Sequence, residues 1–193
     1  MAAEPNRLLT PAEYLARERA GELKHEYVAG EVYAMVGASR EHNLIQTSVQ
    51  ASFYNQLASR QCEVYPSDMR VKIAALGIYT YPDVTVVCGR PELEDSTFDT
   101  LLNPTVIVEI ASPSTQGYDR GLKFQRYRLI PAFREYLLIA QDSRRVEHAI
   151  RQPDNSWSLA AYTGADDVIT LPAVGCTLAL ADVYRKVAFD AQG

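Results

Sequence analysis

The sequence has few cysteines, and they are too far apart to predict a disulfide framework or a structural zinc site. Its three cysteines are Cys62, Cys88 and Cys176, and they form no C-x-x-C pair. Disulfide-rich domains and zinc sites are marked by paired or regularly spaced cysteines. Because free cysteine is commonly buried, we expect all three to be small apolar side chains of the interior.

Long apolar runs are also absent. No stretch approaches the roughly 18 to 20 consecutive apolar residues that a membrane span needs. Residues 1–6, MAAEPN, lack the basic start and apolar stretch of a signal peptide. We therefore expect a cytoplasmic protein with no membrane partner. Hydrophobic residues are 47% and charged residues 22% of the 193-residue chain, which predicts a single globular domain over residues 1–193.

Several motifs that identify an enzyme class directly are missing. His25, His42 and His148 have neither H-x-H nor H-E-x-x-H spacing, which argues against a histidine-based zinc site. The chain has no G-x-S-x-G elbow and no phosphate-cradling glycine loop, which argues against a serine hydrolase or a nucleotide-binding protein. The net charge of −5 is not typical of nucleic-acid-binding proteins, so such a role would depend on local positive charge.

The N-terminal segment contains clear sequence signals for a helix and a hairpin. Thr10 is suited to cap a helix, with Pro11 at the first helical position and Glu13 completing a capping box. Gly21 is expected to end this helix. Residues 24–36 then predict a β-hairpin with its turn at Ala29-Gly30.

The middle of the chain alternates between helical and strand patterns. Apolar residues at helical spacing predict a helix from about Arg40 to Ala58. The other expected elements are strands at 62–73, 78–87 and 106–110, a loop at 112–117, a helix at about 118–129, a strand at 136–140, and a β-rich tail with a short terminal helix. The central order of helix, three strands, helix and strand, over about residues 40–141, indicates an α/β fold with one mixed sheet flanked by helices.

Two acidic residues stand out within the predicted strands. Asp83 and Glu109 are each the only ionisable carboxylate in a strand of apolar and β-branched residues. By strand alternation, Asp83 shares a face with Thr85 and Val87, and Glu109 shares a face with Ile107. Buried acids on neighbouring strands repel unless a cation lies between them, and oxygen ligands favour Mg²⁺ or Mn²⁺. The alternative is that each acid lies at a strand end, where it points to solvent or caps a helix.

A lysine on the following helix is the third candidate for chemistry. Asp119, Lys123 and Arg126 are spaced to share one helix face, from which Lys123 could reach the acidic end of the sheet. There it could orient or deprotonate a water molecule, or stabilise the charge that develops on phosphorus. The alternative is an exposed Asp119–Lys123 pair worth only a few tenths of a kcal/mol.

The same segment is locally basic. Residues 119–134 carry five basic residues and one acid, the basic residues being Arg120, Lys123, Arg126, Arg128 and Arg134. Arg120, Arg126 and Arg128 are therefore the candidate contacts to a phosphate backbone. A solvated helix face is the alternative explanation of such a run.

Taken in order, these residues resemble the Uma-two-type restriction endonuclease family of the PD-(D/E)xK nuclease superfamily. The resemblance spans roughly residues 8–185. It rests on Glu26, Gly30-Glu31-Val32-Tyr33, His42, Pro82-Asp83, the run Val108-Glu109-Ile110-Ala111-Ser112-Pro113-Ser114-Thr115, Asp119 with Lys123 and Tyr127, and Glu135-Tyr136. It implies a restriction-endonuclease-like core, preceded by the N-terminal helix and hairpin and followed by the β-rich tail.

The resemblance also implies a metal centre. Asp83 and Glu109 would be metal ligands, with the backbone carbonyl of Ile110 as a third. The superfamily places a lysine two residues after the glutamate, but Ala111 stands there in this chain. The lysine would then be Lys123, with Lys72 as the alternative.

Four further residues are accessory candidates. They are Glu31, His42, Asp119 and Tyr127, of which Glu31 and His42 would form an outer part of the site.

Together these inferences predict a Mg²⁺-dependent (or Mn²⁺-dependent) endonuclease that hydrolyses DNA phosphodiester bonds through a metal-activated water. Its catalytic residues would be Asp83, Glu109 and Lys123. The alternative is a catalytically weak or inactive nuclease-fold module that binds nucleic acid or a protein partner. Because duplex cutting by a single-site domain calls for two copies, we also expect a homodimer.

Overall fold

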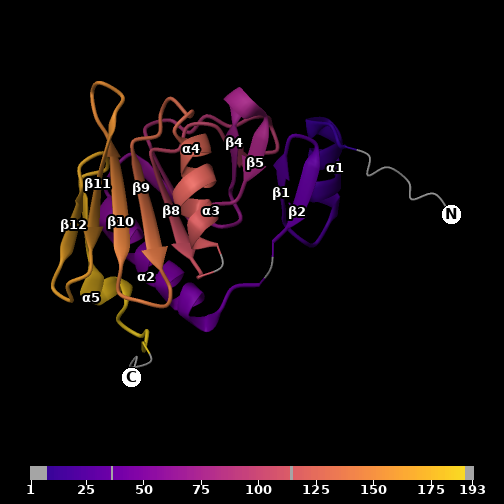
Figure 1. The fold of residues 1–193 in the computed structure, drawn as a ribbon. Helices are drawn as coiled ribbons and strands as arrows, with labels where there is room; N and C mark the ends of the chain where they lie inside the picture. Colours follow the sequence, from indigo (N-terminus) through magenta and orange to yellow (C-terminus); the bar gives the residue numbers. More distant parts are fainter. Residues whose placement is uncertain (1–7, 36, 114, 190–193) are drawn as a thin grey trace.

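The computed structural model describes residues 8–35, 37–113 and 115–189. Figure 1 shows a central sheet with helices on both faces, and a smaller N-terminal part with its own sheet at one end. Within the described residues, no helix is both long enough and apolar enough to cross a membrane. The expected α/β fold with a mixed sheet flanked by helices is confirmed, and further sheets are present that the pattern did not predict.

The central sheet has six strands in the order β11-β10-β9-β8-β6-β3. Their bounds are β3 (Cys62–Pro66), β6 (Val84–Cys88), β8 (Val106–Ala111), β9 (Glu135–Ala140), β10 (Val146–Arg151) and β11 (Trp157–Tyr162). β8 and β9 run parallel, and the other neighbouring pairs run antiparallel. The predicted strands at 106–110 and 136–140 are therefore confirmed, and they lie side by side at the centre of the sheet.

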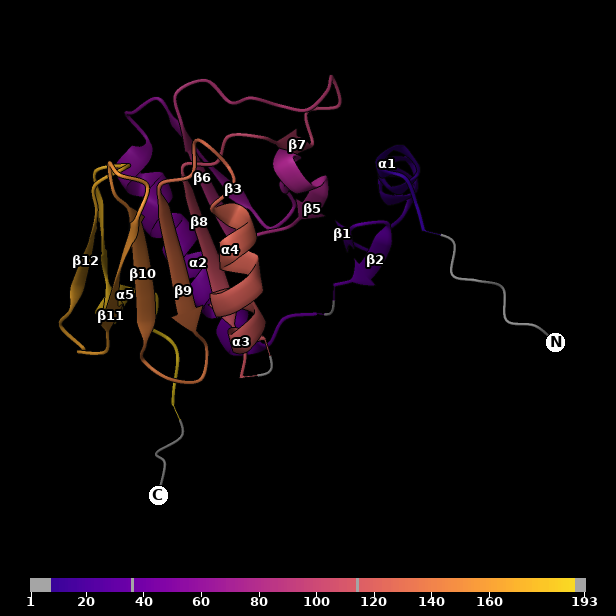
Figure 2. The same ribbon diagram turned by 45° about the horizontal axis from the view of Figure 1, so that its top comes forward.

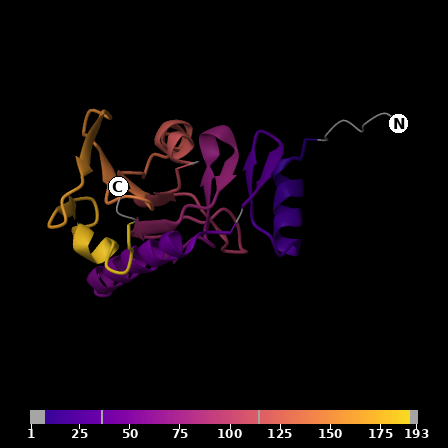
Figure 3. The same ribbon diagram turned by 60° about the horizontal axis from the view of Figure 1, so that its bottom comes forward.

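Each face of this sheet packs against one helical layer. Strand alternation directs Val84, Val86, Val106, Val108 and Ile110 toward α2 (Arg40–Leu57), where they meet Ile45, Val49, Phe53 and Leu57. The opposite face carries Val87, Ile107, Ala111, Tyr136 and Leu138, which pack on Phe124 and Tyr127. Figure 3 shows α2 below the sheet and the helix that contains α3 and α4 end-on above it. Glu109 lies on the second face, among the apolar residues.

The N-terminal elements form as their local signals predict. α1 (Pro11–Ala20) begins at a complete capping box between Thr10 and Glu13, and Gly21 follows its last residue. β1 (His25–Val28) and β2 (Glu31–Ala34) make the hairpin. Gly30 has a φ of +97°, and a Cβ there would lie 2.7 Å from the Cβ of Leu8, so the turn needs glycine on both counts.

The two longest predicted strands are wrong in one respect, because each is broken into two strands that belong to different sheets. Residues 62–73 form β3 and β4 (Arg70–Ile73), and residues 78–87 form β5 (Ile78–Thr80) and β6. The second sheet has the order β2-β1-β5-β4-β7, with β7 at Thr100–Leu101. The first break follows Pro66, the last residue of β3, and the second contains Pro82; proline lacks the backbone N–H that a strand interior needs. Figure 2 shows β5 and β7 of this second sheet near the central sheet and the hairpin of β1 and β2 farther from it.

One consequence of the break concerns Arg70. Strand alternation predicts that Arg70 and Lys72 share one face and that Val71 and Ile73 share the other, and Arg70 is only 3% exposed. Its guanidinium lies over the rings of Tyr14 and Tyr81 and pairs with Asp99 at 2.7 Å. This buried cation joins α1 to the second sheet.

The prediction that all three cysteines are free apolar side chains is also wrong. Cys62 and Cys88 are directly opposite in the β3–β6 pair and form a disulfide, whereas Cys176 is free and buried as predicted. The two positions meet because the chain leaves the central sheet after β3 and returns to it as β6. Their spacing along the sequence gives no sign of this.

The disulfide predicts a specific thiol count. Protein purified without reductant and then denatured should show one reactive thiol per chain, that of Cys176, and three after reduction. Titration with a thiol-reactive chromophore measures both numbers. Three thiols before reduction would mean that the pair stays reduced in the cells that make the protein.

The tail completes the core on the α2 side. β12 (Val168–Leu171) and β13 (Cys176–Ala179) form a two-stranded sheet, and α5 (Leu180–Val183) follows. Their apolar side chains join the cluster that α2 covers. The β-rich tail and short terminal helix are thus confirmed, with β13 as a strand the sequence pattern did not reveal.

Candidate functional site

Glu109 is the most deeply buried carboxylate on the α4 face of the central sheet. It is 4% exposed, and one carboxylate oxygen, Oε1, accepts two partners. Lys123 Nζ lies 2.9 Å from this oxygen, and the Tyr127 hydroxyl donates to it at 2.7 Å. Burial raises the pKa of Glu109 to about 8; the Lys123 charge opposes this rise and the Asp83 charge adds to it. A cation close to Glu109 therefore has a strong influence on its charge.

Lys123 reaches Glu109 because the helix that carries it is not a regular α-helix. The predicted helix at 118–129 consists of α3 (Gln116–Tyr118), a π-helical segment (Asp119–Lys123) and α4 (Phe124–Tyr127). In the π segment the Phe124 N–H bonds the carbonyl of Asp119, five residues earlier. Such segments are rare and often occur at functional sites. Here the segment buries Asp119, Lys123 and Tyr127 along one side of the helix.

The ammonium of Lys123 lies among three carboxylates. Its Nζ is 2.9 Å from Glu109, 3.2 Å from Glu26 and 4.0 Å from Asp119. Burial alone would lower the pKa of Lys123, but the charges of these acids outweigh burial and raise the pKa well above its ordinary value. Lys123 is 8% exposed, so the alternative of an exposed Asp119–Lys123 surface pair is wrong.

Asp83 lies beside this cluster but has different partners. It is mostly buried and comes directly before β6, so the strand alternation that would place it with Thr85 and Val87 does not extend to it. Its Oδ2 accepts the N–H of Ile110 at 2.7 Å, and its Oδ1 is 3.1 Å from His42 Nε2. Gln46 also donates to the Asp83 carbonyl at 2.8 Å. Asp83 thus bonds the Ile110 N–H at the point where the β6–β8 ladder stops.

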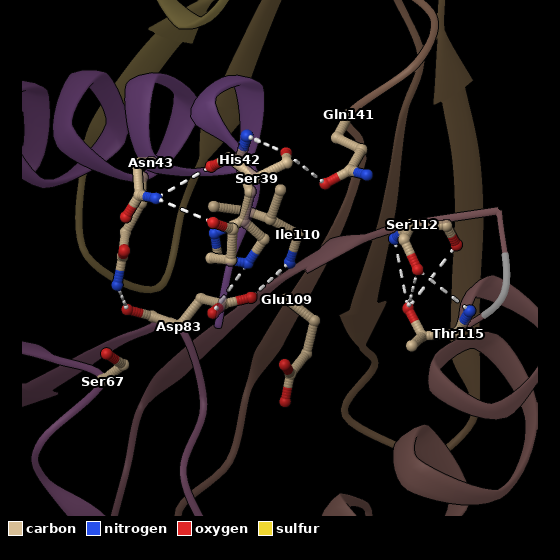
Figure 4. Close-up of polar contacts among 12 residues, drawn as sticks. Ser39, His42, Asn43, Ser67, Asp83, Glu109, Ile110, Ser112, Thr115 and Gln141 are labelled. Carbon is tan, nitrogen blue, oxygen red and sulfur yellow. Dashed lines mark hydrogen bonds and ion pairs between the residues drawn. The ribbon is translucent and has the colours of Figure 1, made fainter. Parts of the chain in front are cut away.

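Figure 4 shows how Asp83 and Glu109 are arranged. Asp83 lies between His42 and the Ile110 amide, and the Glu109 side chain is directed away from His42. The structure therefore brings the predicted accessory residue His42 to the site, through Asp83. For Ile110 it shows an N–H bonded to Asp83; the predicted role of the Ile110 carbonyl stays a prediction.

Glu26 is a site residue that local sequence pattern does not single out. It lies on β1, and its carboxylate accepts the hydroxyl of Thr80 and, at 3.5 Å, the N–H of Tyr81, in addition to contacting Lys123. A glutamate in a polar hairpin is normally a surface residue, so local pattern offers no signal. Its place in the ordered resemblance was the one available indication.

Other predicted candidates lie elsewhere or have other partners. Lys72 pairs with Glu94 and lies over the ring of Tyr79, in the second sheet. Glu31 is exposed and accepts the hydroxyl of Tyr33. Both therefore have partners outside the Glu109 cluster.

The predicted basic patch is not a set of free cations. Arg120 makes two bonds of 2.6 and 2.7 Å to Glu147. Arg126 donates to the Tyr118 hydroxyl, and Arg128 lies over the rings of Phe124 and Trp157. The prediction that Arg126 shares the face of Asp119 and Lys123 is wrong, because the π segment places Tyr127 on that side instead.

The donor set fits a hard divalent cation in type. Glu109, Glu26 and Asp119 face a single ammonium, which leaves excess negative charge in a poorly solvated place. Among the described residues, no group of three or more histidines, cysteines or acids is arranged as a ready-made metal site. Mg²⁺ often uses only one or two carboxylates, together with waters and substrate phosphate, so a pair of acids such as Asp83 and Glu109 is compatible with this ion.

Comparisons with known proteins identify relatives of this sequence and of its fold. The chain is 36% identical over 181 residues to the uncharacterized protein slr1290 of Synechocystis sp., covering 94% of each chain. It is 38% identical over 164 residues to sll1609 of the same organism, covering 85% of this chain and 93% of that one. A crystal structure from Anabaena variabilis, described as a putative nuclease belonging to DUF820, shares the fold with a TM-score of 0.75 at 17% identity, over 93% of this chain and 99% of that chain.

The family assignment follows from a match over most of the chain. The Uma2 model, whose description is "Putative restriction endonuclease", matches residues 11–181. That range includes Glu26, His42, Asp83, Glu109 and Lys123. This protein belongs to the Uma2 family of restriction-endonuclease-like proteins.

Proposed function

We propose that this protein is an endonuclease that hydrolyses DNA phosphodiester bonds with the help of Mg²⁺ or Mn²⁺. The observation that carries the proposal is Lys123, buried on a π-helical segment with its ammonium 2.9 Å from Glu109, beside the strand end that holds Asp83. An ion pair with a purely structural role could stay at the surface, whereas burying this pair costs the desolvation of both charges. The family description and the nuclease named for the structural relative support the same reaction class.

Asp83 and Glu109 are the residues that would hold the ion, with the Ile110 carbonyl as a further donor. When bound, such an ion polarises a phosphoryl oxygen and lowers the pKa of a coordinated water. The Ile110 N–H and His42 fix the carboxylate of Asp83 from two sides. Burial, followed by the charge of Glu109, raises the pKa of Tyr127 well above its usual value, so its hydroxyl keeps its proton and orients Glu109.

Lys123 has the role of a positive charge fixed in place. An ammonium has three donors, and contacts to Glu109 and Glu26 use two of them. The third can hold a phosphoryl oxygen or the attacking water, and it acts in a site where few competing water contacts exist. The charge is maintained at neutral pH because the surrounding acids keep the pKa of Lys123 high.

A second candidate is a nuclease-fold module that binds nucleic acid or a protein without efficient catalysis. The observation that favours it is the pairing of Arg120 with Glu147, together with the net charge of −5, since both reduce the positive charge available to a phosphate backbone. The homodimer expected for duplex cutting stays a prediction under either function.

Plasmid nicking distinguishes the two. Supercoiled DNA should be nicked by the purified protein in Mg²⁺ or Mn²⁺ and left intact in excess chelator, and Asp83→Ala should lack this activity. Asp68→Ala is the matched control, because Asp68 is an exposed aspartate on the turn between β3 and β4. Failure of the wild type to nick DNA with either ion, or nicking that survives in Asp83→Ala, would reject the proposed endonuclease.

A further inference from the structure

The position of the Lys123 ammonium is not explained by Glu109 alone. A lysine side chain carries a compact charge on a flexible four-carbon stem. A single carboxylate therefore fixes the distance of the ammonium from that carboxylate but not its direction. Catalytic groups need to be held within about half an ångström of the productive position. A second contact is therefore required to hold Nζ in one place.

Glu26 supplies that contact, and it is itself held firmly. Its carboxylate lies 3.2 Å from Lys123 Nζ and accepts the hydroxyl of Thr80, a residue that is almost fully buried. The Tyr81 N–H adds a longer bond of 3.5 Å. Because its partners come from β5 and the residue that follows it, Glu26 cannot move freely with the hairpin tip.

These contacts form a closed ring that includes the Lys123 ammonium. Thr80 Oγ1 lies 3.2 Å from the Tyr127 hydroxyl, and Tyr127 donates in turn to Glu109. We call Lys123, Glu26, Thr80, Tyr127 and Glu109 the lysine ring. Two of its members belong to the second sheet, one belongs to the central sheet, and two belong to the helix that contains α4. The lysine ring is therefore assembled from three separate parts of the fold.

We propose that Glu26 is a positioning residue of the centre, which holds the Lys123 ammonium beside Glu109 in the geometry needed for catalysis. This inference rests on the proposed function. The N-terminal hairpin then contributes directly to the site. Tyr27 of β1 pairs with β5, and Glu26, the residue before Tyr27, carries the carboxylate that holds Lys123.

Glu26→Gln tests the inference, because glutamine retains an oxygen that can accept from Thr80 and Tyr81 but loses the charge that attracts Lys123. We expect kcat for plasmid cleavage to fall about tenfold to a hundredfold, as for other residues that orient a catalytic group. KM for DNA and the melting temperature should be unchanged. In a Lys123→Met background the same change should alter kcat less than about twofold, since Glu26 acts through Lys123.

A readout independent of cleavage separates this inference from the proposed function. Lys123 should react slowly with an amine-acylating reagent, followed by peptide mass spectrometry, and several-fold faster in Glu26→Gln. Glu22→Gln, at an exposed glutamate after α1, is the matched control and should leave both readouts unchanged. If the wild type never cleaves DNA, the endonuclease assignment fails, and Lys123 labelling alone decides the role of Glu26. Unchanged labelling and kcat in Glu26→Gln would overturn the inference and leave the endonuclease standing.

Discussion

Replacing Lys123 with methionine is expected to reduce the rate of DNA cleavage by about a hundredfold to a thousandfold, the usual cost of losing one fixed donor to a transition state. Methionine keeps much of the length of the side chain and removes its charge and its three donors. Glu109, Glu26 and Asp119 lose their shared countercharge in this variant, so its melting temperature is measured beside its cleavage rate. Single-turnover cleavage of plasmid DNA with saturating enzyme measures the effect on chemistry rather than on binding.

Two further variants make the result specific to Lys123. Lys72→Met removes the other candidate lysine, which pairs with Glu94 in the second sheet, and should retain cleavage. Lys123→Arg keeps the positive charge but moves the donors to a planar group, and should stay folded with a clear loss of rate. Full activity in Lys123→Met together with loss of activity in Lys72→Met would show that Lys72, and not Lys123, is the catalytic lysine.

The largest expected effect on stability is at Asp99. Its carboxylate pairs with Arg19 at 2.8 Å and with the buried Arg70 at 2.7 Å. Asp99→Asn would leave the Arg70 guanidinium without a countercharge in the interior, which we expect to lower the free energy of unfolding by about 3 kcal/mol. Urea-induced unfolding at pH 7 measures this difference. Asp95→Asn is the control: Asp95 pairs with Arg19 and is more exposed, so its effect on the free energy of unfolding should be clearly smaller.

The pH dependence of this difference has a definite sign. The hydrogen bond from Arg19 is the main reason that the pKa of Asp99 in the folded protein is below its usual value, and burial opposes it. A lowered pKa means that the pair stabilises the fold above the unfolded pKa of about 3.9 and that this contribution is lost as the pH falls toward the folded pKa. The stability difference between wild type and Asp99→Asn should therefore be full at pH 6 to 7 and shrink below about pH 4. A difference that does not change with pH would contradict the ion-pair explanation.

The elements predicted best from the sequence are those whose signals are local. The capping box of Thr10 and Glu13 and the Ala29-Gly30 turn specify their structures through contacts within a few residues. The helix from Arg40 has an apolar stripe that needs no knowledge of its partner. The breaks at Pro66 and Pro82 were missed because the residues on both sides of each break suit a strand, and the change of sheet is a tertiary event.

The residues of the candidate site also divide into those that local sequence pattern identifies and those that depend on contacts distant in the sequence. Glu109 and Lys123 could be chosen because a lone acid in an apolar strand and a lysine on the next helix stand out in the sequence. Glu26 could not, because its burial depends on β5 and on a helix almost a hundred positions later in the chain. The pairing of Arg120 with Glu147 is hidden for the same reason: the acid lies on β10, which no pattern within the helix can indicate.

The π-helical segment also lets the helix contain one residue more than regular winding would allow between Asp119 and Tyr127. In a regular α-helix, residues eight positions apart are rotated by roughly 80° from each other, because each residue adds about 100°. Asp119 and Tyr127 nevertheless both lie on the buried side, since the wider π turns reduce the rotation per residue between them. Exposed Arg120 and Leu122 can be exchanged for other residues without disturbing this alignment. Deleting either one would leave Tyr127 seven positions after Asp119, and regular α-helical winding at about 100° per residue would then keep both on one side, so the π turns accommodate one extra residue in this helix.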